Sequence, residues 1–476
     1  MRGRIGCLDW LAGFAVATAW AAWLLAGQRD VVAYLLPVAI VCVAAGGFGF
    51  LAVVQGRRWA MAGLLAVVAV LPAISFRSRE IGAVGLDWQN GLKLGLWAML
   101  LLTCALTFRI YAGLLRDRAL LAVLSFTGIG ILSSLYSPVP AYSAACALGL
   151  LAYLLFACLI VARCSERDIM LILCHGLALY LAASWISAVA MPESAFLPLQ
   201  EGDEDHRLMG LSSHPNMLAV EAACLLCVVL PAAARGYLDR RLAWVFGLLG
   251  AATILATGSR TTALALALSV GAVWLRQRRS LPAGIVLSGL GAAGIALVFG
   301  LGLMPRFDGM LGSFSRSGDA REILTLTGRT DLWLFVWDTF LDRPLLGYGF
   351  NSAEAVLSRG WYGNADAGYN AHNLLLQALL TTGLVGAVPL TFALAVLCCR
   401  WLTEQSRTLS SYLIPYLMIL GATEAHIASV PTLLTLVLFL AMALTAAERQ
   451  APAGSGAGWF SRMLQGCGFR LGGYAP

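Results

Sequence analysis

Apolar stretches long enough to cross a membrane recur along the whole of this 476-residue chain. A run of roughly twenty apolar residues spans the hydrocarbon core of a bilayer, about 30 Å, as one helix. Inside lipid every backbone N–H and C=O must pair within its own segment, so such runs must be helical. Hydrophobic residues make up 60% of the chain and charged residues 12%, whereas soluble proteins average about a quarter charged residues. The sequence therefore predicts an all-α polytopic membrane protein.

Hydropathy predicts about 12–14 transmembrane helices in two groups, separated by a long polar loop. Residues 1–302 are expected to hold about 11 helices and residues 372–446 about three. Residues 303–371 form the loop, and residues 447–476 form a tail. The expected spans are 10–26, 31–54, 59–75, 91–108, 119–136, 142–162, 169–190, 216–234, 242–257, 261–275, 283–302, 373–399, 410–428 and 431–446.

Arginines divide the connecting loops into two alternating sets. The short loops of one set carry few arginines, and those of the other set carry most of them. The arginine-rich set holds Arg2, Arg4, Arg57, Arg58, Arg109, Arg116, Arg118, Arg163, Arg167, Arg235, Arg240, Arg241, Arg276, Arg278, Arg279, Arg400, Arg407, Arg449, Arg462 and Arg470. The positive-inside rule puts this set, both termini included, in the cytoplasm of a bacterial inner membrane and leaves the 303–371 loop on the outer, periplasmic side. This rule also accounts for the net charge of +7, so nucleic acid is not an expected partner.

The 303–371 loop is too long to be a simple connection, since loops above about fifteen residues are usually functional or disordered. From Thr330 it reads TDLWLFVWDTFLD. Trp333, Val336, Trp337 and Phe340 fall on one helical stripe, which predicts an amphipathic helix at the membrane interface.

The candidate functional residues gather on the outer side of the membrane. They are Arg207 and His214 in RLMGLSSHPN, Arg260 in TGSRTT, Arg329 in TGRTDLW, His372 in YNAHN, and Glu424 with His426. A transporter is expected to place polar groups near the membrane midplane and to use broken helices in repeated halves. A polar constellation at one surface favours an enzyme working at the interface instead.

The residue types allow two interpretations. Arginine binds phosphate through paired hydrogen bonds and stays charged at a membrane, so Arg207, Arg260 and Arg329 are suited to a pyrophosphate. Each of them also fits a lipid-facing arginine that extends to the headgroups. A neutral His372 is suited to take a proton from a hydroxyl group, or alternatively to cap the helix that follows.

The motifs around His372 resemble those of the O-antigen ligase and polymerase superfamily. His372-Asn373, nine residues and then Gly383-Leu384-Val385-Gly386 match the family's H-N-x9-G-x-x-G signature. GRTDLW and DRPLLGYGF are similar to its large periplasmic loop, and RLMGL, HPN, SRT and the Glu424 region follow in the family's order. The resemblance extends from about residue 120 to 440 and is strongest over 327–386.

The resemblance implies a GT-C type glycosyltransferase that takes a glycan from undecaprenyl pyrophosphate. By this resemblance His372 is the general base, Arg329 and Arg260 bind the pyrophosphate, and Arg207 is a weaker match for that role. Asn373, His214, Glu424 and Tyr348 are expected to support the site. Arginine charge stabilises the leaving pyrophosphate without a metal, and direct attack by a hydroxyl group inverts the anomeric centre. No cofactor is expected.

Several alternatives remain open at this stage. The leading acceptor is lipid A–core, but a second lipid-linked repeat would make the protein a polymerase, and a protein acceptor is a third possibility. A glycolipid transporter is the alternative outside enzymes. Asp203 and Asp205 form a D-x-D pattern in the acidic run EGDEDH. Because carboxylates bind hard cations, this run is a competing candidate for a metal site.

Overall fold

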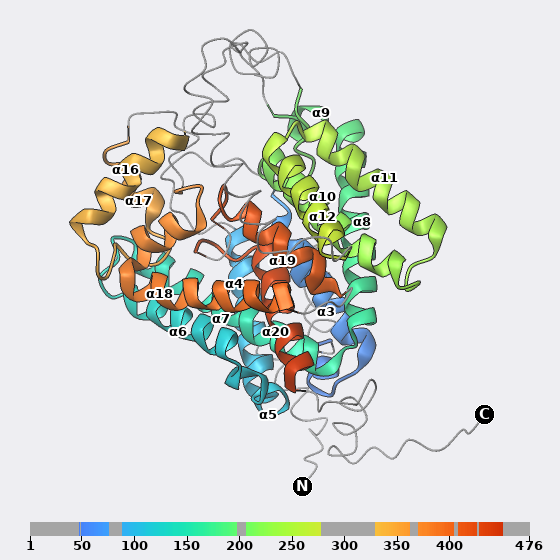
Figure 1. Ribbon diagram of the computed structural model, residues 1–476, viewed down its shortest axis with the longest axis horizontal. Helices are drawn as coiled ribbons and strands as arrows, with labels where there is room; N and C mark the ends of the chain where they lie inside the picture. Colours follow the sequence, from blue (N-terminus) through green and yellow to red (C-terminus); the bar gives the residue numbers. More distant parts are fainter. Residues whose placement is uncertain are drawn as a thin grey trace, which may run out of the picture.

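The structure, a computed structural model, describes residue 47 and residues 49–75, 88–197, 206–277, 329–361, 370–403, 408–425 and 428–450. Within these ranges the regular secondary structure is helical, beside one isolated β-bridge between Phe196 and Leu208. The elements are α3 (Arg58–Val70), η1 (Leu71–Ala73), α4 (Trp88–Leu106), α5 (Phe108–Tyr111), η2 (Leu114–Arg116), α6 (Arg118–Ser133), α7 (Pro140–Arg163), α8 (Glu166–Ala190), α9 (Pro192–Ala195), α10 (Pro215–Ala234), α11 (Arg240–Thr257), α12 (Arg260–Gln277), α16 (Arg329–Asp342), α17 (Ala353–Leu357), α18 (Leu374–Thr403), α19 (Leu409–Leu420) and α20 (Leu433–Gln450). Figure 1 shows their arrangement. The predicted all-α class is confirmed.

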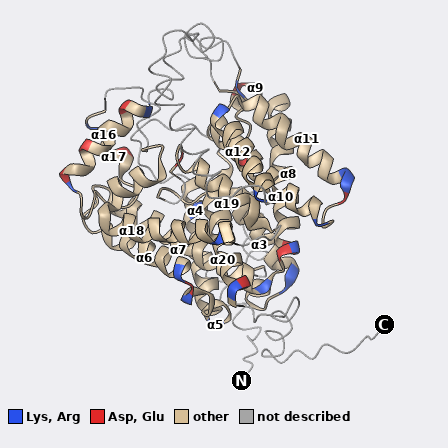
Figure 2. Ribbon diagram, viewed as in Figure 1, with Lys and Arg blue, Asp and Glu red and all other residues tan. Residues whose placement is uncertain are grey.

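Six of the described helices are long and apolar enough to cross a membrane, namely α7, α8, α10, α11, α18 and α20. Helices α3, α6 and α19 are apolar but shorter. In Figure 2 the charged residues colour mainly the ends of the helices and leave long uncharged stretches between them. The chain is therefore a multi-pass membrane protein, as predicted. The expected spans near 10–26 and 283–302 lie outside the described residues.

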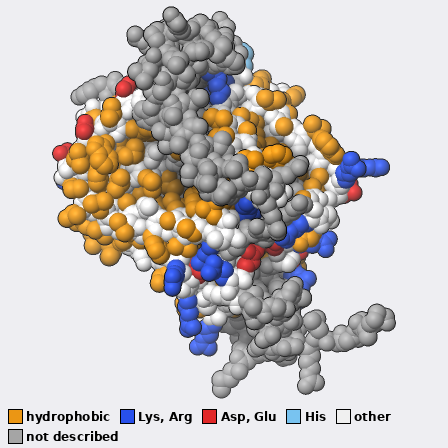
Figure 3. All heavy atoms as spheres, in the orientation of Figure 1, with side chains coloured by type: hydrophobic (Ala, Val, Ile, Leu, Met, Phe, Trp, Pro, Cys, Tyr) orange, Lys and Arg blue, Asp and Glu red, His pale blue; other side chains and the backbone are white. Residues whose placement is uncertain are grey.

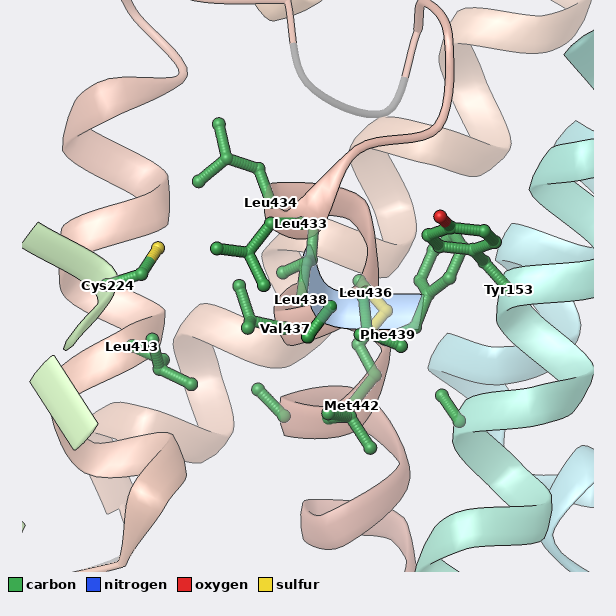
Figure 4. Close-up of a cluster of buried hydrophobic side chains, with 14 of the residues drawn as sticks. Tyr153, Cys224, Leu413, Leu433, Leu434, Leu436, Val437, Leu438, Phe439 and Met442 are labelled. Atoms are coloured by element: carbon green, nitrogen blue, oxygen red, sulfur yellow. The ribbon is translucent and has the colours of Figure 1, made fainter. Parts of the chain in front are cut away.

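Helix α20 forms the centre of the bundle. Its residues are buried from Leu433 to Ala446, and it packs against α7 and α19. In the close-up of Figure 4, Phe439 lies near Tyr153 of α7, and Leu413 of α19 lies on the opposite side of α20. A helix that is apolar all round is stable only where other helices surround it, which explains this central position.

The arginine-rich loops lie together at one end of the bundle. Several contacts join an arginine of this set, at or next to the end of one helix, to a group at the end of another helix. They are Arg163 with the carbonyls of Val53 and Val54, Arg235 with Glu166, Arg276 with the Trp401 carbonyl, and Arg400 with Asp117. A common position at one end is what the positive-inside pattern requires of loops on one side of a membrane.

The ion pair between Arg400 and Asp117 ties the end of α18 to the start of α6. Two hydrogen bonds of 3.0 and 2.5 Å join the guanidinium to the carboxylate, and the side chains are only 7% and 9% exposed. Asp117 is also the N-cap of α6, where Oδ1 accepts the N–H groups of Ala119 and Leu120. One carboxylate therefore fixes both a helix start and a contact between helices.

We expect Arg400→Met to lower the free energy of unfolding by about 3–5 kcal/mol, because it leaves the buried Asp117 carboxylate without its cation. The measurement is an SDS titration of the purified protein in mixed micelles. The control is the double variant Arg400→Met with Asp117→Asn, in which asparagine keeps the N-cap but carries no charge. It should regain most of the loss. Equal losses in the single and double variants would contradict the explanation.

Two of the expected spans differ in the structure, and both differences lie near the proposed chemistry. Helix α18 is not one continuous helix, because Gly383 interrupts it with φ +61° and ψ −166°. Helix α19 ends at Leu420, well before the expected limit of 428, and the chain continues as a turn that contains Glu424. Hydropathy averaged over a whole span did not reveal either change: the break falls within an apolar run, and the apolar residues of α19 outweigh Glu424 and His426 after it.

Helices α16 and α17 form a small cap with its own apolar core, to the upper left in Figure 1. Leu332, Val336 and Phe340 are the buried residues of α16. The predicted helix is thus present. Two residues of the predicted stripe, Val336 and Phe340, are buried in the protein, whereas Trp337 is 45% exposed. Figure 3 shows hydrophobic side chains spread over the same side of the molecule, below the cap. The buried face of α16 also includes Leu332, and the helix packs on α18.

Candidate active site

The turn after α19 presents three successive backbone carbonyls, and each accepts a hydrogen bond from a different group. The bonds are Leu374 N to Gly421 O (2.8 Å), Asn373 Nδ2 to Ala422 O (3.1 Å) and Arg329 Nη1 to Thr423 O (2.7 Å). Gly421 is the C-cap of α19, and Ala422 and Thr423 follow it, so their carbonyls have no partner inside the helix. These carbonyls bring together the start of α18 and the start of α16.

The backbone of His372 adopts the left-handed conformation, with φ +44°. Asn370 Oδ1 accepts the His372 N–H at 2.7 Å. The neighbouring Ala371 donates its N–H to Gln377 Oε1 at 2.9 Å and accepts the indole N–H of Trp333 at 2.9 Å. A left-handed residue other than glycine is uncommon and costs on the order of 1–3 kcal/mol. These three bonds hold the backbone at His372 in that conformation.

Asn373, the second residue of the H-N signature, is the N-cap of α18. Its Oδ1 accepts the N–H groups of Leu375 and Leu376, both at 3.0 Å, which is the usual role of asparagine at a helix start. Its Nδ2 meanwhile binds the turn after α19. Asn373 therefore positions the histidine before it.

Glu424 lies between the candidate base and a candidate phosphate ligand. Its Oε1 is 3.4 Å from Arg329 Nη2, and its Oε2 is 3.9 Å from His372 Nδ1. The three side chains are 11–18% exposed. At 3.9 Å the second contact is too long for a hydrogen bond, and His372 Nδ1 is buried without a hydrogen-bond partner among the described residues. The structure thus brings His372, Arg329, Asn373 and Glu424 into one cluster.

Arg207 and His214 belong to a second cluster, beside the starts of α10 and α12. Arg207 is 7% exposed and donates to Thr257 O at 2.8 Å and to Asn216 Oδ1 at 2.6 Å. His214 is the N-cap of α10, and its Nδ1 accepts the Asn216 N–H at 3.1 Å. Arg207 therefore holds the 207–214 loop against the end of α11, and His214 caps a helix. Arg260, the first residue of α12, is exposed.

Both clusters lie at the same end of the bundle, opposite the arginine-rich loops. Helix α12 packs along α19, and its far end is fixed near the start of α19, since Arg276 contacts Trp401 and Trp401 donates to Ser411 O. Arg260 therefore lies at the end where α19 finishes. The Tyr416 hydroxyl approaches Val220 O at 3.5 Å, which brings the start of α10 to that end as well.

Tyr348 is positioned by the cap. Its hydroxyl group donates to Thr339 O at 3.2 Å, and the Arg343 guanidinium lies 4.9 Å from the centre of its ring. Burial and the nearby Asp342 carboxylate raise the pKa of Tyr348 above its usual value, so the hydroxyl stays neutral. These contacts connect the end of α16 to the PLLGYG segment.

The acidic run with Asp203 and Asp205 lies outside the described residues, as does His426. Within the described part of the chain, no three histidine, cysteine, aspartate or glutamate side chains are grouped as a metal would require.

Sequence reasoning missed three groups that shape the site. Gln377 and Asn370 fix the backbone around His372, and the Thr423 carbonyl holds Arg329. The position of Asn370 two residues before His372 suits an Asx turn and was a detectable signal. A backbone carbonyl leaves no signal in a sequence.

Comparison with known proteins supports the resemblance noted from the motifs. Residues 245–391 match the family described as O-antigen ligase, and this region contains Arg260, Arg329 and His372. Over 143 residues the chain is 31% identical to the exopolysaccharide production protein ExoQ of Rhizobium meliloti (strain 1021). The matched part covers 28% of this chain and 30% of that relative. The chain thus contains a region similar to the O-antigen ligase family, and it spans less than a third of the length of the curated relative that it matches.

Proposed function

We propose that this protein transfers an O-antigen-type glycan en bloc from undecaprenyl pyrophosphate to a sugar hydroxyl of lipid A–core, on the periplasmic face of the inner membrane. The observation that supports the proposal is the Glu424 carboxylate, which lies 3.4 Å from the Arg329 guanidinium and 3.9 Å from the His372 imidazole. A transfer from pyrophosphate to a hydroxyl group requires a proton acceptor and a phosphate ligand close together, and we assign these roles to His372 and Arg329.

In the proposed reaction, the acceptor oxygen attacks the anomeric carbon as the bond from that carbon to the pyrophosphate breaks. Glu424 faces Nδ1 of His372, so Nε2 is the nitrogen left to take the hydroxyl proton. The departing undecaprenyl pyrophosphate carries away the electron pair, and the Arg329 guanidinium stabilises its charge. Attack from the face opposite the leaving group inverts the anomeric centre. The chain's own charges serve here in place of a metal.

Arg329 and Glu424 also imply an order of events. The Arg329 guanidinium donates hydrogen bonds to Thr423 O and to Glu424 Oε1. A donor pyrophosphate competes with Glu424 for Arg329, because a guanidinium forms two parallel bonds with phosphate oxygens. Glu424 released in this way is free to orient His372. Donor binding thus prepares the base.

Polymerisation of lipid-linked repeats is the second candidate. It is favoured by the name of the relative from Rhizobium meliloti, which refers to exopolysaccharide production. The donor chemistry is the same in both, and only the acceptor differs.

We expect purified protein in EDTA to join the donor glycan to lipid A–core, with the product identified by mass spectrometry. Reactions without lipid A–core serve as the control. If the donor glycan lengthens while lipid A–core stays unmodified, the polymerase proposal replaces the ligase. If turnover appears only after Mg²⁺ or Mn²⁺ is restored, the metal-independent mechanism is wrong and Asp203 and Asp205 become the next residues to change.

A further inference from the structure

The segment Pro344–Gly349, which we call the latch, fills the break in α18. The interruption at Gly383 leaves backbone N–H and C=O groups of α18 without helical partners. The backbone of the latch forms hydrogen bonds with these groups. The bonds are Tyr348 N to Leu380 O (3.0 Å), Gly349 N to Thr381 O (2.7 Å), Leu384 N to Pro344 O (2.8 Å) and Val385 N to Leu345 O (3.1 Å). Irregular backbone at membrane depth is tolerated only where such groups find partners. The latch and the break therefore form one unit.

Glycines are required on both sides of this contact. A Cβ atom on Gly383 would lie 2.2 Å from Leu345 O, and one on Gly347 would lie 2.7 Å from Gly383 N. Both glycines also have positive φ, +61° and +66°, which is strained for other residues. The first glycine of the G-x-x-G signature thus allows two backbones to touch.

The other side of the latch contacts the end of α6. The Tyr136 hydroxyl donates to Leu346 O at 2.7 Å, and Ser133 Oγ accepts the Phe350 N–H at 2.8 Å. Gly349 has φ +109°, and a Cβ there would lie 2.5 Å from the Cβ of Ser137. The latch is thus held between α18 and α6.

Helix α16 is therefore fixed at both of its ends. The latch follows its C-terminal end at Asp342, and Arg329 at its N-terminal end binds Thr423 O. A helix of fourteen residues is about 21 Å long, so a shift of the latch moves Arg329. The indole of Trp333 ties the same helix to Ala371, next to His372.

We propose that the latch sets the position of Arg329 relative to His372, and that Gly383, Gly347 and Gly349 are positioning residues for glycan transfer. The expected effect on the rate of glycan transfer rests on the proposed function. The latch itself is defined by backbone contacts and is testable without any substrate.

The test replaces Leu384, whose N–H binds Pro344 O, with proline. Leu384 is the first residue of the second half of α18, where proline is tolerated, and the extended ψ of Gly383 suits a residue before proline. Leu384→Pro therefore removes one latch bond and sets the proline Cδ against Pro344 O, while the second half of α18 keeps its own helical hydrogen bonds. Leu384→Ala is the matched control, because it removes the same side chain and keeps the N–H. Hydrogen exchange of the 345–349 amides and donor kinetics are measured for both variants in the full-length protein.

We expect Leu384→Pro to speed exchange in the latch at least about tenfold and to lower kcat by about 10–100-fold, since small misplacements of reacting groups are that costly. In Leu384→Pro, hydrogen exchange outside the latch should match wild type. Leu384→Ala should match wild type in both hydrogen exchange and donor kinetics. Faster exchange with unchanged kcat would overturn the positioning role, and unchanged exchange would overturn the latch. If wild-type protein transfers no glycan, the proposed function fails. The positioning role is then judged by the affinity for undecaprenyl pyrophosphate, which must fall in Leu384→Pro alone. Gly383→Ala should show the same changes more strongly.

Discussion

Replacing His372 with alanine is expected to lower kcat for glycan transfer by at least about 10²–10⁴-fold, the usual contribution of a positioned general base. Without the imidazole, the acceptor hydroxyl keeps its proton while its oxygen attacks, and the barrier rises. The fold should persist, because the bonds that fix this backbone come from Asn370, Gln377 and Trp333. Donor KM should change little, since the proposed phosphate ligand is Arg329.

The measurement is initial transfer rate against donor concentration, with folding checked by thermal unfolding in detergent. His175→Ala is the matched control. His175 lies in α8, exposed, with Nδ1 2.7 Å from Leu171 O, and has no place in the proposed chemistry. If His372→Ala keeps more than half of the wild-type kcat, His372 is not the base.

Replacing Arg329 with alanine is expected to lower kcat/KM for the donor by about 10²–10³-fold, the cost of removing one donor group from a developing anion. The loss should appear in both kcat and donor KM, because Arg329 would bind the pyrophosphate before and during bond cleavage. Arg329→Lys should recover little, since an ammonium lacks the planar fork that binds two phosphate oxygens.

The direct measurement is the affinity for undecaprenyl pyrophosphate, without any glycan, for wild type and Arg329→Ala. Arg359→Ala removes the same charge from an exposed position just after α17 and should bind like wild type. Equal affinities in wild type and Arg329→Ala would argue that Arg329 serves only to hold Thr423 and Glu424 in place.

Regular spans were predictable from the sequence because a continuous run of roughly twenty apolar residues is enough to indicate a transmembrane helix. Helix α10 runs over Pro215–Ala234 where 216–234 was expected, and α7 over Pro140–Arg163 where 142–162 was expected. Hydropathy does not respond to backbone geometry, so the break at Gly383 and the early end of α19 were missed. The glycine was visible, but its positive φ depends on a latch that precedes it by more than thirty residues.

The sequence predicted which residues are candidates for the site. It predicted less well which of these residues lie together in the structure. His372, Arg329, Asn373 and Glu424 lie together, and the motifs had named all four. Arg207 and His214 are instead joined through Asn216 beside α10. Arg207 and His214 lie in this second cluster because of the way the helices pack in three dimensions. No local pattern in the sequence predicts which loops come to lie next to each other.

The three carbonyls after α19 have a consequence for how this protein is made. Each accepts a bond from a segment synthesised earlier, and Arg329, Asn373 and Leu374 have this turn as their common anchor. A chain still emerging from the ribosome with its helices inserted only through α18 already contains its histidine and its arginine, but not the turn that joins them. We therefore expect the proposed transfer activity to require the last helices that enter the membrane, and a chain that ends after α18 to be inactive in the transfer assay.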